Sequence, residues 1–233
     1  MNVDVLAVGA HPDDVEAGAG GVVAKLIKNG RRVAILDLSR GELASRGSPE
    51  ERAAEAAEAA RILGVAERAN AALPDGAIAN STEQQRVVVP HIRRFRPQAI
   101  LAPMDGDRHP DHGAARSLVR DANFLSGLAR IPGGEAPWRA STVFHYRVHG
   151  KADPPQLVID ITREFETKLA AMGAYASQFH NPGYNGPPTY VASPEFWESI
   201  RVRAAYWGSL IGVQYGEPLF SDGPLALDLP PGC

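Results

Sequence analysis

The chain has 233 residues, of which 44% are hydrophobic and 22% charged, and its formal net charge is −3. This composition is typical of a soluble globular protein and predicts one domain over residues 1–233, without the basic surface that binds nucleic acids. No apolar run reaches the roughly 18 residues of a membrane-spanning helix, so no membrane partner is expected. The single cysteine, Cys233, allows no disulfide within the chain, and no cationic leader is visible, so a cytoplasmic location is predicted.

Strand-like and helix-like segments alternate through the first half of the chain. Residues 3–10 are apolar and rich in valine, which predicts a buried parallel strand, and residues 15–30 predict a helix that ends at Gly30. The same patterns predict further strands at residues 31–39, 68–73 and 97–104, and further helices at residues 48–64, 82–97 and 112–125. Such alternation is typical of a parallel sheet with right-handed crossover connections.

Two of these helices carry specific local signals. The helix at residues 48–64 begins with Ser48 as the expected N-cap, followed by Pro49, and Glu51 is placed to complete a capping box. Pro90 lies inside the next predicted helix, so we expect a kink or two short helical segments there.

The pattern changes in the second half of the chain. Strands are predicted at residues 141–148 and 155–161, and helices at residues 162–179, with Thr162 as the cap, and 194–212. The segment between these helices, residues 180–194, is rich in glycine, proline and asparagine. Ordered loops of about 15 residues are often functional, so we expect this loop to help form the mouth of a substrate site.

Acidic residues and histidines follow two of the predicted strands. His11, Asp13 and Asp14 come directly after the first strand. The fourth strand is followed by a second cluster, which contains Asp105, Asp107, His109, Asp111 and His112. Because ligands of open α/β sheets bind at the carboxyl ends of the strands, we expect both clusters to face one crevice.

The two clusters together contain the ligand types of a hydrolytic zinc site. Such sites use histidines and a carboxylate and leave a fourth position open. His11 and Asp14 are three residues apart and can meet at a turn that enters a helix, and a distant histidine would complete the set. Asp13 would remain free to accept a proton from bound water, while a histidine kept protonated by a carboxylate could face a developing oxyanion.

The motifs "AHPDD" at residues 10–14 and "HPDH" at residues 109–112 make the chain resemble the LmbE/PIG-L-like family of zinc-dependent N-acetylglucosaminyl deacetylases. The resemblance implies an α/β, Rossmann-like fold with a mostly parallel sheet and helices on both faces. It also implies one Zn²⁺ per chain, held by His11, Asp14 and His112.

The same resemblance implies roles for four further residues. Asp13 would be the catalytic base, and His109 would stabilise the oxyanion, with Asp111 behind it. Arg52 matches an arginine that lies at the substrate end of the site in similar proteins. In the long loop, substrate contacts are predicted for His180, Tyr184 and Tyr190, because sugar sites often use aromatic platforms. The remaining histidines carry no motif and are expected to be structural or exposed: His91, His145 and His149.

Six further segments extend the resemblance to one branch of that family, the deacetylases of bacillithiol biosynthesis, which act on N-acetylglucosaminyl-malate. These segments are "SRGELASRGSPEER", "LPDGAI", "DRHPDH", "YASQFHNP", "TYVASPEFWE" and "IGVQYGE". The implied partner is therefore a small-molecule N-acetylglucosaminyl substrate. The implied assembly is a homo-oligomer, which is a hexamer in similar proteins.

Three alternatives to this function stay open at this point. The first is a sister activity, either a thiol-sugar conjugate amidase or a chitooligosaccharide deacetylase. The second is a nucleotide-binding module, which the sequence disfavours because "GAHPDD" follows the first strand in place of a glycine-rich phosphate turn. The third is a non-catalytic metal-binding or sugar-binding protein, which Asp13 disfavours because a binding site needs ligands but no base.

Overall fold

The computed structural model describes residues 1–149 and 154–225. The strands in these residues are β1 (Val5–Gly9), β2 (Val33–Ser39), β3 (Glu67–Leu73), β4 (Ala99–Pro103), β5 (Thr142–Tyr146), β6 (Leu157–Asp160) and β7 (Gly216–Ser221). They form one sheet in the order β3-β2-β1-β4-β5-β7-β6. Strands β1 to β5 run parallel, whereas β7 is antiparallel to both of its neighbours. The predicted mostly parallel sheet is confirmed.

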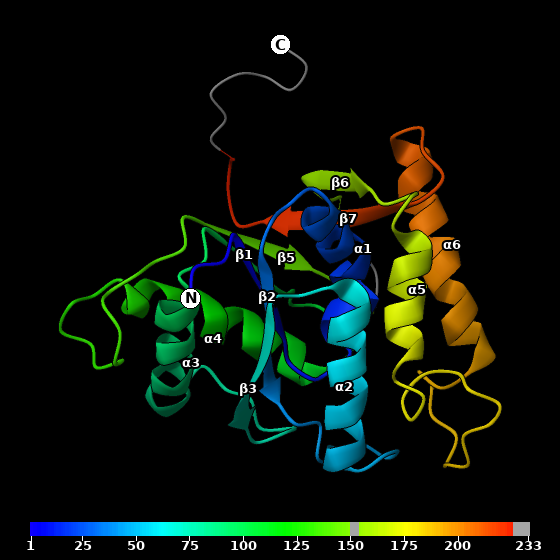
Figure 1. Cartoon of the computed structure of the whole chain (residues 1–233), viewed down its shortest axis with the longest axis horizontal. Coiled ribbons are helices and arrows are strands. Elements are labelled where there is room, and N and C mark those ends of the chain that lie inside the picture. The colour runs from blue at the N-terminus through cyan, green and yellow to red at the C-terminus, as the bar shows by residue number, and fades with distance from the viewer. Residues whose placement is uncertain (150–153, 226–233) are drawn as a thin grey trace.

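Six helices cover the two faces of the sheet in the described residues. They are α1 (Asp14–Lys28), α2 (Pro49–Leu63), α3 (Thr82–Phe95), α4 (Pro110–Ser126), α5 (Phe165–Gly173) and α6 (Pro194–Leu210). Figure 1 shows α3 and α4 on one side of the sheet and α2, α5 and α6 on the other, and α1 packs with this second group. Each layer buries its own apolar core against the strands. None of the helices described is long and apolar enough to cross a membrane.

Local sequence signals explain where the helices near the site begin. The side chain of Ser48 accepts the main-chain N–H of Glu51 at 3.1 Å, and the Glu51 carboxylate accepts the main-chain N–H of Ser48 at 3.4 Å, so the predicted capping box of α2 is confirmed. Helix α4 begins at Pro110, earlier than predicted, because the side chain of His109 acts as its N-cap.

One expectation about secondary structure is wrong, another is wrong in part, and one strand was not expected. Pro90 does not divide α3, which is a single helix across it. Thr162 does not cap α5, because its hydroxyl oxygen accepts the main-chain N–H of Tyr215 at 3.2 Å and the helix begins later, after Glu164. The sequence patterns do not predict strand β7, because it lacks a polar and apolar alternation and contains Pro218, a residue that disfavours strands.

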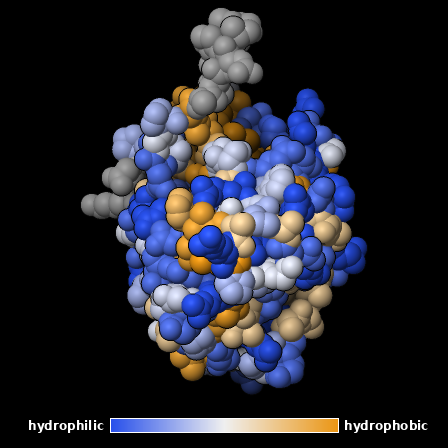
Figure 2. Space-filling model, turned by 90° about the vertical axis from the view of Figure 1, so that its left-hand side faces the viewer, coloured by the Kyte–Doolittle hydropathy of each residue, from blue (hydrophilic) through white to orange (hydrophobic). Residues whose placement is uncertain are grey.

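The outer face of the α3 and α4 layer is mostly hydrophilic, with smaller apolar patches between the polar side chains (Figure 2). Strands β1 and β4 are neighbours at the centre of the sheet, but the helices that follow them lie on opposite faces. This divergence leaves a crevice at the carboxyl ends of the two strands, which is where open α/β sheets bind ligands.

Candidate active site

A cavity of about 450 Å³ lies at the carboxyl ends of the central strands. Its walls include residues that follow β1, β2, β3, β4 and β5, together with residues of the loop before α6. Both predicted clusters reach it, since His11, Asp13 and Asp14 line one part and His109 and His112 another. The expectation that the two clusters face one crevice is therefore confirmed.

The turn between β1 and α1 has a strained backbone. Asp13 directly precedes the helix and has a backbone φ of 115°, a conformation that residues with side chains rarely adopt. Its carboxylate makes no capping hydrogen bond. Such strain costs about 1–3 kcal/mol and is concentrated at functional sites, so it marks this turn as functional.

The carboxylate of Asp14 lies between two imidazoles. Its Oδ2 is 3.4 Å from Nδ1 of His11, and its Oδ1 is 3.1 Å from Nε2 of His112. These three side chains are buried. His11 and Asp14 follow β1, whereas His112 lies in the first turn of α4, after β4. Two imidazole nitrogens and a carboxylate are a donor set that Zn²⁺ binds, so the group fits a divalent cation. The structure thus brings together the three residues predicted as ligands, whose role as ligands stays a prediction.

Each imidazole has a carboxylate on its other nitrogen. Nδ1 of His112 lies 3.2 Å from Oδ2 of Asp107. Nε2 of His11 lies 3.1 Å from Oδ1 of Asp75 and 3.2 Å from Oδ2 of Asp111. Carboxylates in this position fix the orientation of metal-binding histidines and raise their basicity.

The pKa values of this group show how strongly it favours positive charge. Burial acts to raise the pKa of Asp14, but His112 and His11 outweigh it and hold that pKa well below its usual value. Burial likewise acts to lower the pKa of His112, but Asp14 and Asp107 raise it to about 10. A divalent cation can take the place of the imidazole protons in such a field.

Two sets of potential ligands in the described residues have closely grouped ligand atoms, and neither of them includes Asp14. Ligand atoms of His11, His109 and His112 lie within 4.8 Å of one another, as do those of His11, Asp75 and Asp111. The first set lacks a carboxylate. In the second set Asp75 and Asp111 contact Nε2 of His11, the nitrogen that does not face Asp14, so these carboxylates are better described as the support of His11 than as a second cation site.

Asp13 is paired with Arg52. One terminal nitrogen of Arg52 lies 2.9 Å from Oδ2 of Asp13 and also donates to the carbonyl oxygen of Pro12. Burial raises the pKa of Asp13 to about 7, although the Arg52 charge opposes the rise. A carboxyl group with a pKa near neutrality is suited to general acid–base catalysis. Whether Arg52 also reaches a substrate stays a prediction.

The expected position of Asp111 behind His109 is wrong. The carboxylate of Asp111 contacts His11 and accepts the main-chain N–H of Gly76 at 2.9 Å. Nδ1 of His109 instead accepts the main-chain N–H of Asp111 at 3.3 Å, because His109 caps α4. Burial together with His11 and His112 lowers the pKa of His109, so its neutral form with hydrogen on Nε2 is favoured. The structure therefore does not support the protonated imidazole that we expect from the sequence at the oxyanion.

The long loop before α6 contributes to the cavity, but not through the residues predicted from the sequence. Thr189 and Val191 line the cavity. Tyr190 lies between them and packs its ring 6.2 Å from that of His149, while the guanidinium of Arg108 lies 4.6 Å above the Tyr190 ring. Tyr190 is 53% exposed, so it is placed at the rim.

The other two predicted loop residues, His180 and Tyr184, are not among the described residues that line the cavity. The hydroxyl of Tyr184 donates to Glu51 at 3.1 Å, and its ring lies 4.8 Å from the guanidinium carbon of Arg46. Arg46 also donates to the carbonyl oxygen of Pro187 at 3.1 Å, so these contacts fasten the loop to the start of α2. Substrate contacts by His180 and Tyr184 stay predictions.

Four residues at the site were given no role from the sequence: Arg46, Asp75, Asp107 and His149. Asp75 and His149 follow β3 and β5, so the rule that found the other clusters could have found them. The rule does not reach them from the sequence alone, because residues 68–73 lack a clear strand pattern and the place of β5 beside β4 cannot be inferred from local patterns. The expectation that His149 is only structural or exposed is wrong in one respect, since it lines the cavity and its ring lies parallel to that of His112 at 6.1 Å.

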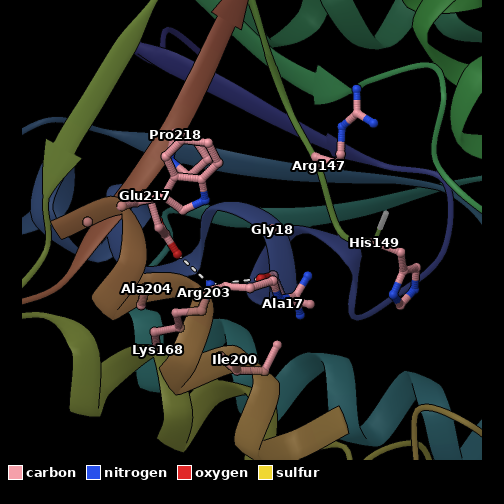
Figure 3. Close-up of a pocket in the computed structure, with 12 residues that line it drawn as sticks. Ala17, Gly18, Arg147, His149, Lys168, Ile200, Arg203, Ala204, Glu217 and Pro218 are labelled. Atoms are coloured by element: carbon pink, nitrogen blue, oxygen red, sulfur yellow. Dashed lines mark hydrogen bonds and ion pairs between the residues drawn. The ribbon is translucent and has the colours of Figure 1, made fainter. Parts of the chain in front are cut away.

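A second, smaller cavity of about 50 Å³ lies between α1, α6 and β7 (Figure 3). A buried ion pair between Lys168 and Glu217 forms part of its wall. Lys168 also donates to the carbonyl oxygen of Ala17 at 2.7 Å, and Glu217 accepts the main-chain N–H groups of Gly21 and Val22 at 3.2 and 2.7 Å. These contacts satisfy both charges, so we regard the pair as a structural tie between α5, β7 and the middle of α1.

Comparisons with known proteins identify the family. The PIG-L family, described as GlcNAc-PI de-N-acetylase, matches residues 6–123, about half of the chain. A diacetylchitobiose deacetylase from Thermococcus kodakarensis is 30% identical over 91% of this chain and 80% of its own length. A protein described as a probable N-acetyl-alpha-D-glucosaminyl L-malate deacetylase 2 from Bacillus anthracis is 26% identical over 75% of this chain and 81% of its own length.

Solved structures agree on the fold. The conserved protein TT1542 from Thermus thermophilus is 38% identical, with a TM-score of 0.89 and 99% of each chain covered. A 4-carboxy-2-hydroxymuconate hydratase from Pseudomonas putida has a TM-score of 0.79, with 98% of this chain and 99% of that chain covered, but is only 22% identical. Because this hydratase shares the architecture, the fold alone does not define the reaction.

The match over half of the chain, the identity to the Thermococcus protein and the histidine–carboxylate site point to one class of enzyme, the metal-dependent deacetylases. This chain belongs to the PIG-L family.

Proposed function

We propose that this protein is a zinc-dependent hydrolase that removes the acetyl group from an N-acetylglucosaminyl conjugate, with N-acetylglucosaminyl-malate of bacillithiol biosynthesis as its substrate. The observation that carries the proposal is the contact of the Asp14 carboxylate with the imidazoles of His11 and His112. A metal-dependent deacetylase needs cation ligands, a nearby base and a hydrogen-bond donor to the oxyanion. Candidates for all three roles line one cavity: His11, Asp14 and His112 as ligands, Asp13 as base and His109 as donor.

The residues around the cavity suggest a division of labour. A cation held by His11, Asp14 and His112 would supply Lewis acidity to a water molecule and to the amide carbonyl of the substrate. Asp13 takes the proton of the attacking water and delivers it to the leaving sugar amine, for which a pKa near 7 is well suited. Neutral His109 donates a hydrogen bond from Nε2 to the oxyanion, while its Nδ1 is held by α4.

Two arginine side chains at the cavity support the proposal of an acidic substrate. Arg46 and Arg52 both line it, in a chain with a net charge of −3. A guanidinium can bind a carboxylate through two parallel hydrogen bonds, which gives both affinity and orientation. Because one nitrogen of Arg52 is engaged by Asp13, any malate carboxylate would have to use the rest of that guanidinium or Arg46.

A second candidate substrate is an N-acetylated chitooligosaccharide. It is favoured by the relative from Thermococcus, which is named a diacetylchitobiose deacetylase and covers most of the chain. The two candidates share the reaction and differ in the group attached to the acetylated sugar. Two further features belong to the proposal as well: a cytoplasmic location and assembly into a homo-oligomer.

The experiment that tests the proposal measures acetate release by the zinc-loaded protein from four substrates. These are N-acetylglucosaminyl-malate, N,N′-diacetylchitobiose, free N-acetylglucosamine and a cysteinyl conjugate of an acetylated sugar. We expect the highest kcat/KM on the malyl glycoside. A higher value on diacetylchitobiose would replace the malate proposal by the second candidate, and no acetate from any of the four would overturn the proposed hydrolase.

A further inference from the structure

The carboxylate of Asp107 is fixed from the segment that follows β5. Its Oδ2 accepts the main-chain N–H groups of Val148 and His149, at 3.1 and 2.8 Å. The same oxygen lies 3.2 Å from Nδ1 of His112, and the side chains of both residues are at most 2% exposed. The two main-chain amides therefore fix the position of the carboxylate oxygen that faces Nδ1 of His112.

Helix α6 in turn contacts that segment through Phe196, whose ring lies 5.3 Å from that of His149, and through a hydrogen bond from Arg203. A terminal nitrogen of Arg203 donates to the carbonyl oxygen of Val148, and its Nε donates to the carbonyl oxygen of Ser199 at 3.2 Å. The guanidinium carbon also lies 5.6 Å from the centre of the Phe196 ring. Figure 3 shows Arg203 on α6 and His149 on the segment that follows β5. Both residues line the smaller cavity.

We propose that Arg203 is a positioning residue for the cation site: by binding the Val148 carbonyl it fixes the two amides that hold Asp107, and Asp107 orients His112. The inference rests on the proposed function, because it takes His112 to be a ligand of the cation. It adds to that function a dependence of the site on α6, a helix that contributes none of the proposed ligands.

The chemistry of the contacts explains why an arginine suits this position. Its planar guanidinium can hold two carbonyl oxygens in fixed directions, one in α6 and one after β5, whereas a lysine offers a point charge without that geometry. The carboxylates that support metal-binding histidines typically change metal affinity 10–100-fold when they are altered. A residue one step further away is expected to have a smaller effect of the same kind.

The test measures the Zn²⁺ dissociation constant by competition with a chelator, for the full-length protein and three variants. Asp107→Asn keeps an oxygen acceptor but removes the charge behind His112, and Arg203→Met removes the contact with Val148. Arg201→Met is the matched control, because Arg201 lies on the same helix but donates to the hydroxyl of Tyr215 at 2.7 Å. We expect about 10–100-fold weaker binding for Asp107→Asn, about tenfold for Arg203→Met and no change for Arg201→Met.

Two further measurements separate positioning from a general loss of structure. The visible spectrum of the Co²⁺-loaded protein should change in Asp107→Asn and in Arg203→Met but not in Arg201→Met, and Arg203→Lys should restore part of the Zn²⁺ affinity. Thermal unfolding with excess chelator shows whether each variant is folded. Wild-type Zn²⁺ affinity in a folded Arg203→Met protein would overturn the inference, and so would an equal loss in Arg201→Met. A wild-type protein that binds no Zn²⁺ would instead overturn the proposed function.

Discussion

Two groups of buried charges lie against the same helix, and they differ in kind. The cavity cluster stands at the start of α1 and consists of His11, Asp13, Asp14 and His112. The helix pair stands beside the middle of α1 and consists of Lys168 and Glu217. Both groups are buried and both contain ionised side chains, so burial of charge does not by itself distinguish a functional site from a structural one.

What separates them is how well each group is satisfied. The helix pair has one charge of each sign, and both of its members also form hydrogen bonds with main-chain groups of α1. The cavity cluster has two imidazoles surrounded by an excess of carboxylates, and its backbone is strained at Asp13. Two residues that contact it, Arg52 and Asp107, have buried side-chain atoms without a hydrogen-bond partner among the described residues. Unsatisfied charge and local strain are the features expected where a ligand completes the structure.

The sharpest test of this difference is a change of Asp13, which we expect to affect turnover and not stability. Asp13→Asn should retain the bound metal and lose about 10²–10⁴-fold in kcat, the contribution of a positioned acid–base group. Measurements of kcat and of zinc content in the same preparation decide the point. Activity within a few-fold of wild type would refute the role of Asp13 as base.

A change in the helix pair should have the opposite effect. Lys168→Met leaves the Glu217 carboxylate buried without its counter-charge, and breaking a buried pair in this way costs about 3–5 kcal/mol of the free energy of unfolding. Zinc affinity should be unchanged. The control is the double variant Lys168→Met/Glu217→Gln, which removes both charges and should recover much of the stability. If Lys168→Met left stability intact but abolished metal binding, the helix pair would have to be regarded as part of the site.

A change of Arg52, which pairs with Asp13 at the cavity, should have an effect of intermediate size. If its guanidinium also binds a malate carboxylate, Arg52→Lys should lower kcat/KM for the malyl glycoside about tenfold more than for free N-acetylglucosamine, because a charge-assisted contact contributes about 1.5–3 kcal/mol. Equal losses on both substrates would mean that Arg52 serves the site through Asp13 alone.

The smallest expected effect is a shift of the pH profile. Asp13 must be deprotonated to act as a base, so kcat/KM should rise with pH through the pKa of that carboxyl, which burial raises to about 7 against the opposing charge of Arg52. Arg52→Met removes the opposing charge, so the pKa should rise and the acid limb should move to higher pH. An acid limb that stays in place or moves to lower pH would show that Arg52 does not control the ionisation of Asp13.

The parts of this molecule that local chemistry determines were predictable from the sequence. The capping box of α2 and the convergence of the clusters after β1 and β4 follow from short-range signals and from the geometry of parallel strands. The contact between Asp111 and His11 was not predictable, because it joins residues 100 positions apart and depends on how α4 is placed. The same reason applies to Arg203, whose contact with Val148 spans 55 positions, and to β7, whose sequence lacks a strand pattern.

The most direct measurement of the central claim is zinc content together with acetate release in His112→Ala. His112 contributes one of the two imidazoles around Asp14, so its removal should abolish tight zinc binding and deacetylation together, while His91→Ala, a change in α3, should alter neither. A His112→Ala protein that holds one zinc per chain and releases acetate at the wild-type rate would contradict the account of the site given above.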